Sequence, residues 1–324
     1  MRVLVTGSEG SLMQEVIPHL LDHGHDVVGV DSFFRHGTID RDRNYELIEG
    51  DLVDPAVVAR TVRGVDGIIQ AAARIFGVSG FHQFPADILS HDITLHQNVL
   101  WAAKDLGIEK VAYISSSMVF ERVEHHPSKE EDVFEAQIPA TDYGLSKLTG
   151  ERLSLAFQQQ YGLNYVIWRP FNIITPHEKA ETEQGISHVF ADFIRLIISE
   201  GRNPIPVLGD GSQVRCFTWI DDVASTIAKW SFDSATDNEI FNLGNPEPTS
   251  MKQLADIIYE EGQELGLIPR SDRPLEIEPQ AIFGDDVKIR VPDVTKAESR
   301  LGFKPTKNTR ESVRACLASL LSHE

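Results

Sequence analysis

The sequence predicts an α/β fold in which helices cover both faces of a doubly wound parallel sheet. Three observations indicate this architecture. Short apolar segments alternate with helical stretches through the first half of the 324 residues. The first apolar segment runs directly into a glycine-rich turn and an amphipathic helix. Polar or small residues follow successive strands, and in such a sheet those positions share the edge at which ligands bind.

The N-terminal unit has the order strand, glycine turn, helix. Val3 to Val5 form the expected strand, and the helix ends near Gly24. Turn glycines let the backbone approach a pyrophosphate, which the helix N-terminus attracts. The expected contacts lie in the turn and at the start of the helix: Gly7, Gly10, Ser11 and Leu12. Met13 replaces a third glycine that normally permits close packing, so the helix must sit differently or hold the cofactor less well.

A second strand over residues 26–30 is closed by Asp31, which lies 21 residues beyond Gly10. This is the usual position of a carboxylate that accepts hydrogen bonds from an adenosine ribose. Because a carboxylate there repels a 2′-phosphate, the sequence predicts NAD rather than NADP. The turn and Asp31 together indicate a dinucleotide-binding (Rossmann) sheet.

Four more strands are expected at residues 45–48, 67–70, 111–114 and 165–168, with one helix over 85–106. Several residues stand at or just after strand ends, where we expect one ligand-binding edge. They are Gly7, Asp31, Asp51, Ala72, Ser116 and Arg169. Of these, Asp51 and Ala72, together with the neighbouring Leu52, are expected to contact the cofactor.

Tyr143 and Lys147 stand four residues apart at the start of another expected helix. This spacing places both side chains on one helix face. A nearby ammonium lowers the pKa of a phenol, and a phenol with a lowered pKa is a usable base. The pair therefore predicts acid–base chemistry at the ligand-binding edge.

Composition narrows the possible partners. The formal net charge of −19 argues against nucleic acid and anionic membranes, which need a basic surface. No apolar run suits a signal peptide or a membrane span. Two distant cysteines fit a reducing compartment, so the expected location is the cytoplasm. His19 and His23 are expected in a surface turn, and no metal site is predicted.

The organisation changes beyond Phe171. A helix is expected over residues 185–200, and a helix over 222–232 with a strand over 240–243 should return to the main sheet. Helices over 251–265 and within 295–321 would build a smaller, discontinuous lobe. The predicted domains are therefore residues 1–172 plus about 216–247 for NAD, and about 173–215 plus 248–324 for the substrate.

These features resemble the extended short-chain dehydrogenases that act on nucleotide sugars, over nearly the whole chain. The resemblance is carried by the glycine turn, Asp31, the serine run 115–117, Tyr143-x-x-x-Lys147 and three later segments. Those segments are Arg169-Pro170-Phe171-Asn172, Gly209-Asp210-Gly211-Ser212-Gln213-Val214-Arg215 and Arg290-Val291-Pro292-Asp293.

The resemblance implies a role for each matching residue. Ser116 would hold the substrate oxygen beside Tyr143, with either neighbouring serine as the alternative by one residue. Ser115 and Ser117 would otherwise be strand-end residues satisfied by the backbone, and Ser117 is also a candidate for substrate binding. Lys147 would keep the phenol acidic and bind the nicotinamide ribose. Asn172, Arg215 and Arg290 would bind the sugar nucleotide, since guanidinium forks match phosphate oxygens. The helices near 85–106 and 143–160 match those that pair in family homodimers.

Departures from the family pattern reduce the number of candidate reactions. Related dehydratases carry an acidic pair where this chain has Ser117-Met118, and related decarboxylases tend to place Glu at Met118. The Cys and Lys of related GDP-mannose 3,5-epimerases would fall at Met118 and near Gly185. The remaining reaction is 4-epimerisation through a 4-keto intermediate. The alternatives are another nucleotide-sugar reaction, such as net redox or decarboxylation, and a catalytically silent NAD sensor.

Two residues can be interpreted in more than one way from the sequence. Cys216 replaces the Asp that usually follows the phosphate-binding Arg, and it is expected to be a packed strand residue rather than a nucleophile. Arg74 could bind a substrate carboxylate, such as that of a uronic acid, or pair with an acidic neighbour. The nucleotide base and the sugar stay open as well.

Overall fold

A computed structural model describes residues 1–321, except 36, 38–40, 179 and 285. Seven parallel strands form the central sheet in the order β11-β6-β5-β4-β1-β2-β3. Their bounds are β1 (Arg2–Thr6), β2 (Asp26–Asp31), β3 (Glu46–Glu49), β4 (Gly67–Gln70), β5 (Lys110–Ile114), β6 (Asn164–Pro170) and β11 (Glu239–Leu243). The predicted doubly wound parallel sheet is confirmed, and its strand order reverses between β1 and β4.

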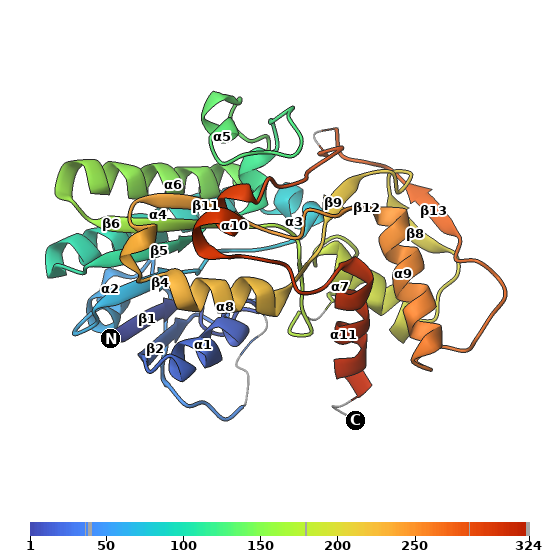
Figure 1. Ribbon diagram of the computed structural model, residues 1–324, viewed down its shortest axis with the longest axis horizontal. Coiled ribbons are helices and arrows are strands. Elements are labelled where there is room, and N and C mark those ends of the chain that lie inside the picture. Colours follow the sequence, from blue (N-terminus) through green and yellow to red (C-terminus); the bar gives the residue numbers. More distant parts are fainter. Residues whose placement is uncertain (36, 38–40, 179, 285, 322–324) are drawn as a thin grey trace.

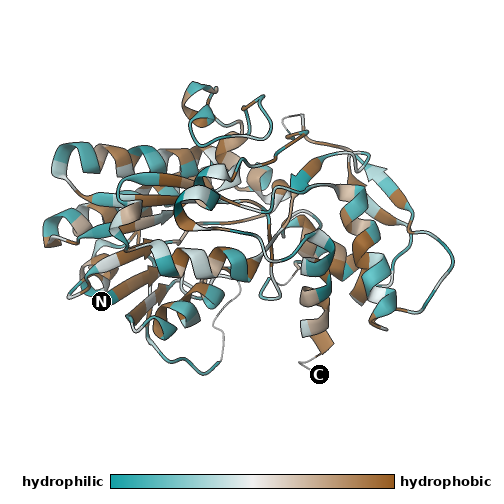
Figure 2. Ribbon diagram, viewed as in Figure 1, coloured by the Kyte–Doolittle hydropathy of each residue, from teal (hydrophilic) through white to brown (hydrophobic). Residues whose placement is uncertain are grey.

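Helices cover both faces of this sheet (Figure 1). One face carries α1 (Met13–Asp22), α8 (Ile220–Trp230) and α10 (Thr295–Leu301). The other carries α2 (Pro55–Thr61), α4 (Pro85–Leu106) and α6 (Asp142–Tyr161). Successive strand residues point to opposite faces, so Val3 and Val5 join the first core and Leu4 joins the second. Figure 2 shows the resulting apolar sheet between helices that are hydrophilic on their outer surfaces.

A smaller lobe lies beyond the carboxyl ends of the strands, on the right of Figure 1. Its helices are α7 (Val189–Phe193), the π-helical η2 (Ile194–Ser199), α9 (Met251–Glu264) and α11 (Thr309–Leu321). Its short strand pairs are β8 (Ile205–Leu208) with β13 (Ile277–Gln280), β9 (Val214–Cys216) with β12 (Pro248–Ser250), and β7 (Ile173–Ile174) with β10 (Thr218–Trp219). The connecting elements are α3 (Val78–Gln83), η1 (Ser117–Phe120), α5 (Asp132–Glu135) and η3 (Ser234–Thr236). A separate apolar core built around Phe193, Phe217 and Leu254 holds the lobe together.

The helix expected over residues 185–200 is shorter than predicted. It begins only at Val189, because Gly185 has a left-handed φ of +82° and the backbone of His188 is extended. The apolar pattern continued through residues whose backbone is not helical, so the pattern alone placed the helix start too early.

The stretch 295–321 is divided between the main domain and the lobe. It holds two helices, because Gly302 ends α10 with a φ of +69°. Both were expected in the lobe, but Ala297 and Leu301 of α10 pack in the core of the main sheet. Only α11 packs in the lobe. The division of the chain into two domains stays a prediction.

Arg169, expected at the ligand-binding edge, is instead buried inside the main domain. Its Nε and Nη2 donate to the two carboxylate oxygens of Glu151 at 2.8 and 2.7 Å. Both side chains are almost fully buried, at 0 and 1% exposure. A buried pair of this kind must be complete, because either charge alone would be strongly destabilising. Arg169 therefore ties β6 to α6, the helix that carries Tyr143.

Among the described residues, no helix combines the length and the apolar character that crossing a membrane requires.

Candidate active site

The predicted site residues all line one cavity of about 980 Å³ between the sheet and the lobe. This volume lies at the upper end of the range for small-molecule sites. The cofactor candidates among them are Gly7, Gly10, Ser11, Leu12, Asp31, Asp51, Leu52 and Ala72. The catalytic and substrate candidates are Arg74, Ser116, Ser117, Tyr143, Lys147, Asn172, Arg215 and Arg290.

The glycine turn forms one end of this cavity and fits a pyrophosphate. Gly7 has a φ of +65°, and a Cβ there would lie 2.9 Å from the Cα of Ala72. A Cβ at Gly10 would lie 3.0 Å from the Gly7 carbonyl oxygen. In the part of the chain that is described, the N–H groups of Ser11 and Leu12 have no acceptor. Donors at the start of α1 are therefore available to an anion.

Met13, the departure from the glycine pattern, starts α1 with its side chain turned into the core. It is 1% exposed and packs in the same apolar cluster as Val16 and Leu20. The helix thus accommodates Met13 by packing it against the sheet, and the backbone of the turn keeps its shape around Gly7 and Gly10.

Asp31 lies beside the turn with its carboxylate held by backbone donors. Its Oδ2 accepts from the Glu9 N–H at 2.9 Å and its Oδ1 from the Phe33 N–H at 2.8 Å. Burial raises the pKa of Asp31, and these hydrogen bonds oppose the rise. Asp51 is the second predicted carboxylate. Each of its two carboxylate oxygens lies 3.0 Å from His91 Nε2.

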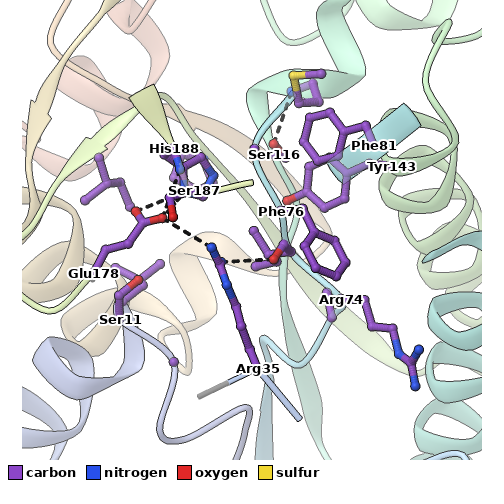
Figure 3. Close-up of a pocket in the computed structure, with 18 of the residues that line it drawn as sticks. Ser11, Arg35, Arg74, Phe76, Phe81, Ser116, Tyr143, Glu178, Ser187 and His188 are labelled. Atoms are coloured by element: carbon purple, nitrogen blue, oxygen red, sulfur yellow. Dashed lines mark hydrogen bonds and ion pairs between the residues drawn. The ribbon is translucent and has the colours of Figure 1, made fainter. Parts of the chain in front are cut away.

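Tyr143, Ser116 and Lys147 come together at the centre of the cavity. Tyr143 lies in the first turn of α6, and Ser116 follows β5 as the N-cap of η1. The Ser116 hydroxyl accepts from the Met118 N–H at 3.1 Å and lies close enough to the Tyr143 phenol to act on its pKa. Lys147 donates to the Ile114 carbonyl at 2.9 Å, and its Nζ lies 5.8 Å from the centroid of the Tyr143 ring. Figure 3 shows Ser116 and Tyr143 on the same side of the cavity.

The expected lowering of the Tyr143 pKa is wrong for this structure. Burial raises the pKa well above its ordinary value, because a phenolate in an apolar site is poorly solvated. The neighbouring Ser116 hydroxyl lowers the pKa, but by less than burial raises it. Lys147 is directed at a backbone carbonyl and does not donate to the phenol oxygen. Helical spacing predicted a shared face correctly, but it could not predict the distance between the two polar ends.

Lys147 has a lowered pKa for the same reason. Burial lowers it to about 8, while the charges of Asp92 and Glu151 oppose the change. Asp92 is fully buried on α4 and accepts from the Arg74 N–H at 2.9 Å and from the Ser146 hydroxyl at 3.3 Å. Asp92 was not predicted, although an acid on the apolar face of a helix was a signal present in the sequence.

This arrangement predicts a pH dependence. Lys147 loses its charge as the pH rises through about 8, so kcat should fall above that pH. Asp92→Asn removes a charge that favours the ammonium and should move the falling limb to lower pH by about one unit. The measurement is kcat against pH, with Asp87→Asn on the exposed face of α4 as the control. An unchanged limb in Asp92→Asn would show that Asp92 does not act on Lys147.

Two buried arginines lie at the lobe end of the cavity. Arg290 donates from Nη1 to Met118 Sδ at 2.6 Å and from Nη2 to Asn172 Oδ1 at 3.2 Å, while its Nε has no partner among the described residues. Arg215 pairs with Asp286 at 3.2 Å. Burial and the charge of Arg215 lower the pKa of Arg290 to about 9. A thioether is a poor partner for a guanidinium, so this end of the cavity favours an anion.

Arg74 lines the cavity at some distance from its centre. Its guanidinium stacks 4.0 Å from the centroid of Phe34 and points away from Tyr143 (Figure 3). Among the described residues its side chain has no acidic partner within ion-pair distance, and its Nε has no hydrogen-bond acceptor. A contact with a substrate carboxylate stays a prediction.

The serines beside Ser116 and the cysteine after Arg215 are all buried. Ser115, expected to be satisfied by the backbone, instead donates to Glu151 Oε1 at 2.5 Å. Ser117 lines the cavity from the start of η1.

Cys216 packs inside the protein, as expected, and burial raises the pKa of its thiol to about 12. A thiol with so high a pKa is a poor nucleophile.

Two further side chains shape the centre of the cavity and were not predicted. Phe81 stacks on the Tyr143 ring with centroids 4.7 Å apart and an interplanar angle of 6°. Glu121 lines the cavity and accepts from the Thr141 N–H at 2.8 Å and from the Thr141 hydroxyl. It therefore supports the first turn of α6. Neither residue was given a role from the sequence, although Phe81 lies in a segment that resembles one in the GDP-mannose 3,5-epimerases, so only the folded chain reveals their contacts.

Residues 3–244 match the profile of the NAD dependent epimerase/dehydratase family. The chain belongs to this family. Its cofactor is therefore NAD, as the turn and Asp31 predicted, and the glycine turn offers a backbone surface that fits its pyrophosphate. The resemblance to extended short-chain dehydrogenases is confirmed.

Two relatives match this family member over almost its full length. It is 28% identical to a UDP-glucuronate 4-epimerase of Thermodesulfobacterium geofontis, covering 96% of this chain and 93% of the relative. It is 27% identical to UDP-glucuronic acid decarboxylase 1 of Arabidopsis thaliana, covering 97% of this chain and 68% of the relative. The fold matches that of a UDP-glucose 4-epimerase of Thermotoga maritima, solved with UDP-glucose. That comparison has a TM-score of 0.84 and 24% identity, covering 100% of this chain and 99% of the other.

Proposed function

We propose that this enzyme is a nucleotide-sugar 4-epimerase that inverts C4 through a transient 4-keto intermediate. The observation that carries the proposal is the placement of Ser116, Tyr143 and Lys147 in one cavity between the glycine turn and the buried arginines. This arrangement lets a dinucleotide and a diphosphate sugar meet at Tyr143. Relatives that act on UDP-sugars support this substrate class.

In the proposed mechanism Tyr143 first gives its phenolic proton to solvent, and the resulting phenolate accepts the proton of the C4 hydroxyl while Ser116 holds the same oxygen by a hydrogen bond. NAD supplies the redox chemistry at C4 when it is bound. Lys147, at 2.9 Å from the Ile114 carbonyl, holds positive charge beside the Tyr143 ring and is placed to bind the nicotinamide ribose. Arg215 and Arg290, with Asn172, hold the nucleotide diphosphate while the keto sugar presents its other face. The protein contributes positioning and electrostatics.

Glu121 favours a second candidate, another reaction that passes through a keto sugar. Its carboxyl lines the cavity, burial raises its pKa, and the hydrogen bonds from Thr141 oppose the rise. It supplies an ionisable group near Tyr143 that Ser117 and Met118 lack. Elimination or decarboxylation would use such a group, whereas 4-epimerisation does not need it.

Proton NMR of the protein with NAD and a panel of UDP-, GDP- and dTDP-sugars, including uronic acids, separates these functions. The proposal expects a C4 epimer without net redox. Steady NADH production or release of carbon dioxide would instead select the second candidate. Tight NAD binding with no turnover across the panel would identify a silent sensor. The cytoplasmic location stays a prediction.

We also propose that the enzyme is a homodimer paired through α4 and α6. Trp101, Leu106 and Tyr161 expose large apolar surfaces on these helices, at 46, 55 and 40%. Burying them against a second copy would remove that surface from water. Light scattering should show a dimer, and Trp101→Glu should give a monomer. Phe134→Glu, at an exposed position on α5, is the control, and a monomeric wild type would contradict the proposal.

A further inference from the structure

Glu9, in the glycine turn, holds two arginines with one carboxylate. Arg41 donates from Nε to Oε2 and from Nη2 to Oε1, both at 3.1 Å. Arg43 donates from Nε to Oε1 at 3.0 Å and from Nη2 to Oε2 at 2.8 Å. The Tyr45 hydroxyl donates to the same carboxylate. Glu9 is 2% exposed, so two guanidinium forks converge on a buried acid.

This cluster adjoins the carboxylate proposed to bind the adenosine ribose. The Glu9 N–H donates to Asp31 Oδ2 at 2.9 Å. Glu9 and Asp31 both line the cavity, whereas Arg41 and Arg43 are not among its described lining residues. The four side chains carry two negative and two positive charges, which balance. Burial would raise the pKa of Glu9, but hydrogen bonds from Arg43 and Arg41 lower it to about 2, so its charge persists at neutral pH.

We propose that Glu9 is a second determinant of cofactor choice, which rejects NADP by holding Arg41 and Arg43 away from the ribose 2′ position. A 2′-phosphate beside Asp31 would meet two carboxylates, and both guanidinium forks nearby are already engaged by one of them. Without the Glu9 charge, the guanidinium groups of Arg41 and Arg43 would lose the carboxylate that now binds them, and both would be available beside the ribose 2′ position. Guanidinium groups bind phosphate oxygens in the same bidentate manner as they bind a carboxylate.

A purely structural role is the competing interpretation, in which the cluster only ties residues 41–45 to the turn. The two interpretations differ in the effect expected when Glu9 loses its charge. A structural role predicts weaker binding of both cofactors in proportion. The selectivity role predicts that NADPH binding improves relative to NADH.

The test is the dissociation constant of NADH and of NADPH for Glu9→Gln, followed by nicotinamide fluorescence. We expect the ratio of the NADPH constant to the NADH constant to fall about tenfold or more, because phosphate–guanidinium hydrogen bonds replace repulsion. The added substitutions Arg41→Gln and Arg43→Gln should abolish that gain. Glu46→Gln is the matched control: it also removes one carboxylate that pairs with an arginine, Arg2, at 2.7 Å.

A ratio within twofold of wild type in folded Glu9→Gln protein would overturn the proposal. So would an equal fall in Glu46→Gln, or a gain that survives loss of both arginines. If Glu9→Gln does not fold, Glu9→Asp replaces it in the test. The shorter side chain keeps the charge but cannot reach the guanidinium groups of both Arg41 and Arg43. An unchanged ratio of the NADPH and NADH constants in Glu9→Asp would count equally against the proposal. The inference rests on Asp31 binding the ribose. Asp31→Asn tests that separately, because it should weaken NADH binding, whatever the role of Glu9.

Discussion

Tyr143→Phe should reduce kcat on the order of a thousandfold while NAD remains bound. The substitution removes only the phenol oxygen, which is the group proposed to move the C4 proton. The ring should keep its stacking on Phe81 at 4.7 Å, so the fold and the cavity should be preserved. The measurement is turnover of the active sugar nucleotide, with NADH binding as the test of an intact site.

Tyr161→Phe provides the matched control for this prediction. Tyr161 ends the same helix, is 40% exposed and should tolerate loss of its hydroxyl without effect on kcat. Activity in Tyr143→Phe near that of the control would remove Tyr143 from the mechanism. Burial raises the pKa of the Tyr143 phenol, so the protein holds Tyr143 in its neutral form before the reaction. The proposed role of Tyr143 as a base is therefore tested directly by this substitution.

The second large effect is expected at Arg290. Arg290→Met should weaken UDP or GDP binding by about 2 kcal/mol or more, roughly thirtyfold, while NADH binding stays unchanged. The buried guanidinium has only Met118 Sδ and Asn172 Oδ1 as hydrogen-bond partners among the described residues. A diphosphate would supply the anionic partner that it lacks. Calorimetric titration of the NAD-loaded enzyme measures the change.

Stability should not fall together with nucleotide affinity in Arg290→Met. Burial and the neighbouring Arg215 both penalise the charged form of Arg290, as its lowered pKa of about 9 shows. The nucleotide-free variant should therefore melt no lower than the wild type, because the apolar Met carries no charge to desolvate. Arg270→Met, at a guanidinium that is 77% exposed, is the control. Unchanged nucleotide affinity in Arg290→Met would place the diphosphate elsewhere.

Local sequence patterns predicted the features that depend on backbone geometry. Gly7 is required by a positive φ and by the approach of Ala72. A strand followed by a glycine turn already implied a tight turn here, whereas the approach of Ala72 became known only from the fold. Parallel strands end at one edge, so Asp31 and Ser116 could be placed together before their distances were known. The helix expected at about residues 85–106 is observed as Pro85–Leu106, and it ends where Gly107 adopts a left-handed conformation.

Spacing along the chain was thus sufficient to predict the sheet and the cofactor, whereas the roles of Ser116, Asn172, Arg215 and Arg290 came from the family resemblance. The pairing of polar groups, in contrast, became known only from the folded chain. Glu151 holds Ser115 and Arg169, Asp92 lies near Lys147, and Glu9 draws Arg41 and Arg43 together. These contacts join segments far apart in the chain, and burial sets their pKa values. Neither the partners nor the degree of burial is encoded in any short stretch of residues.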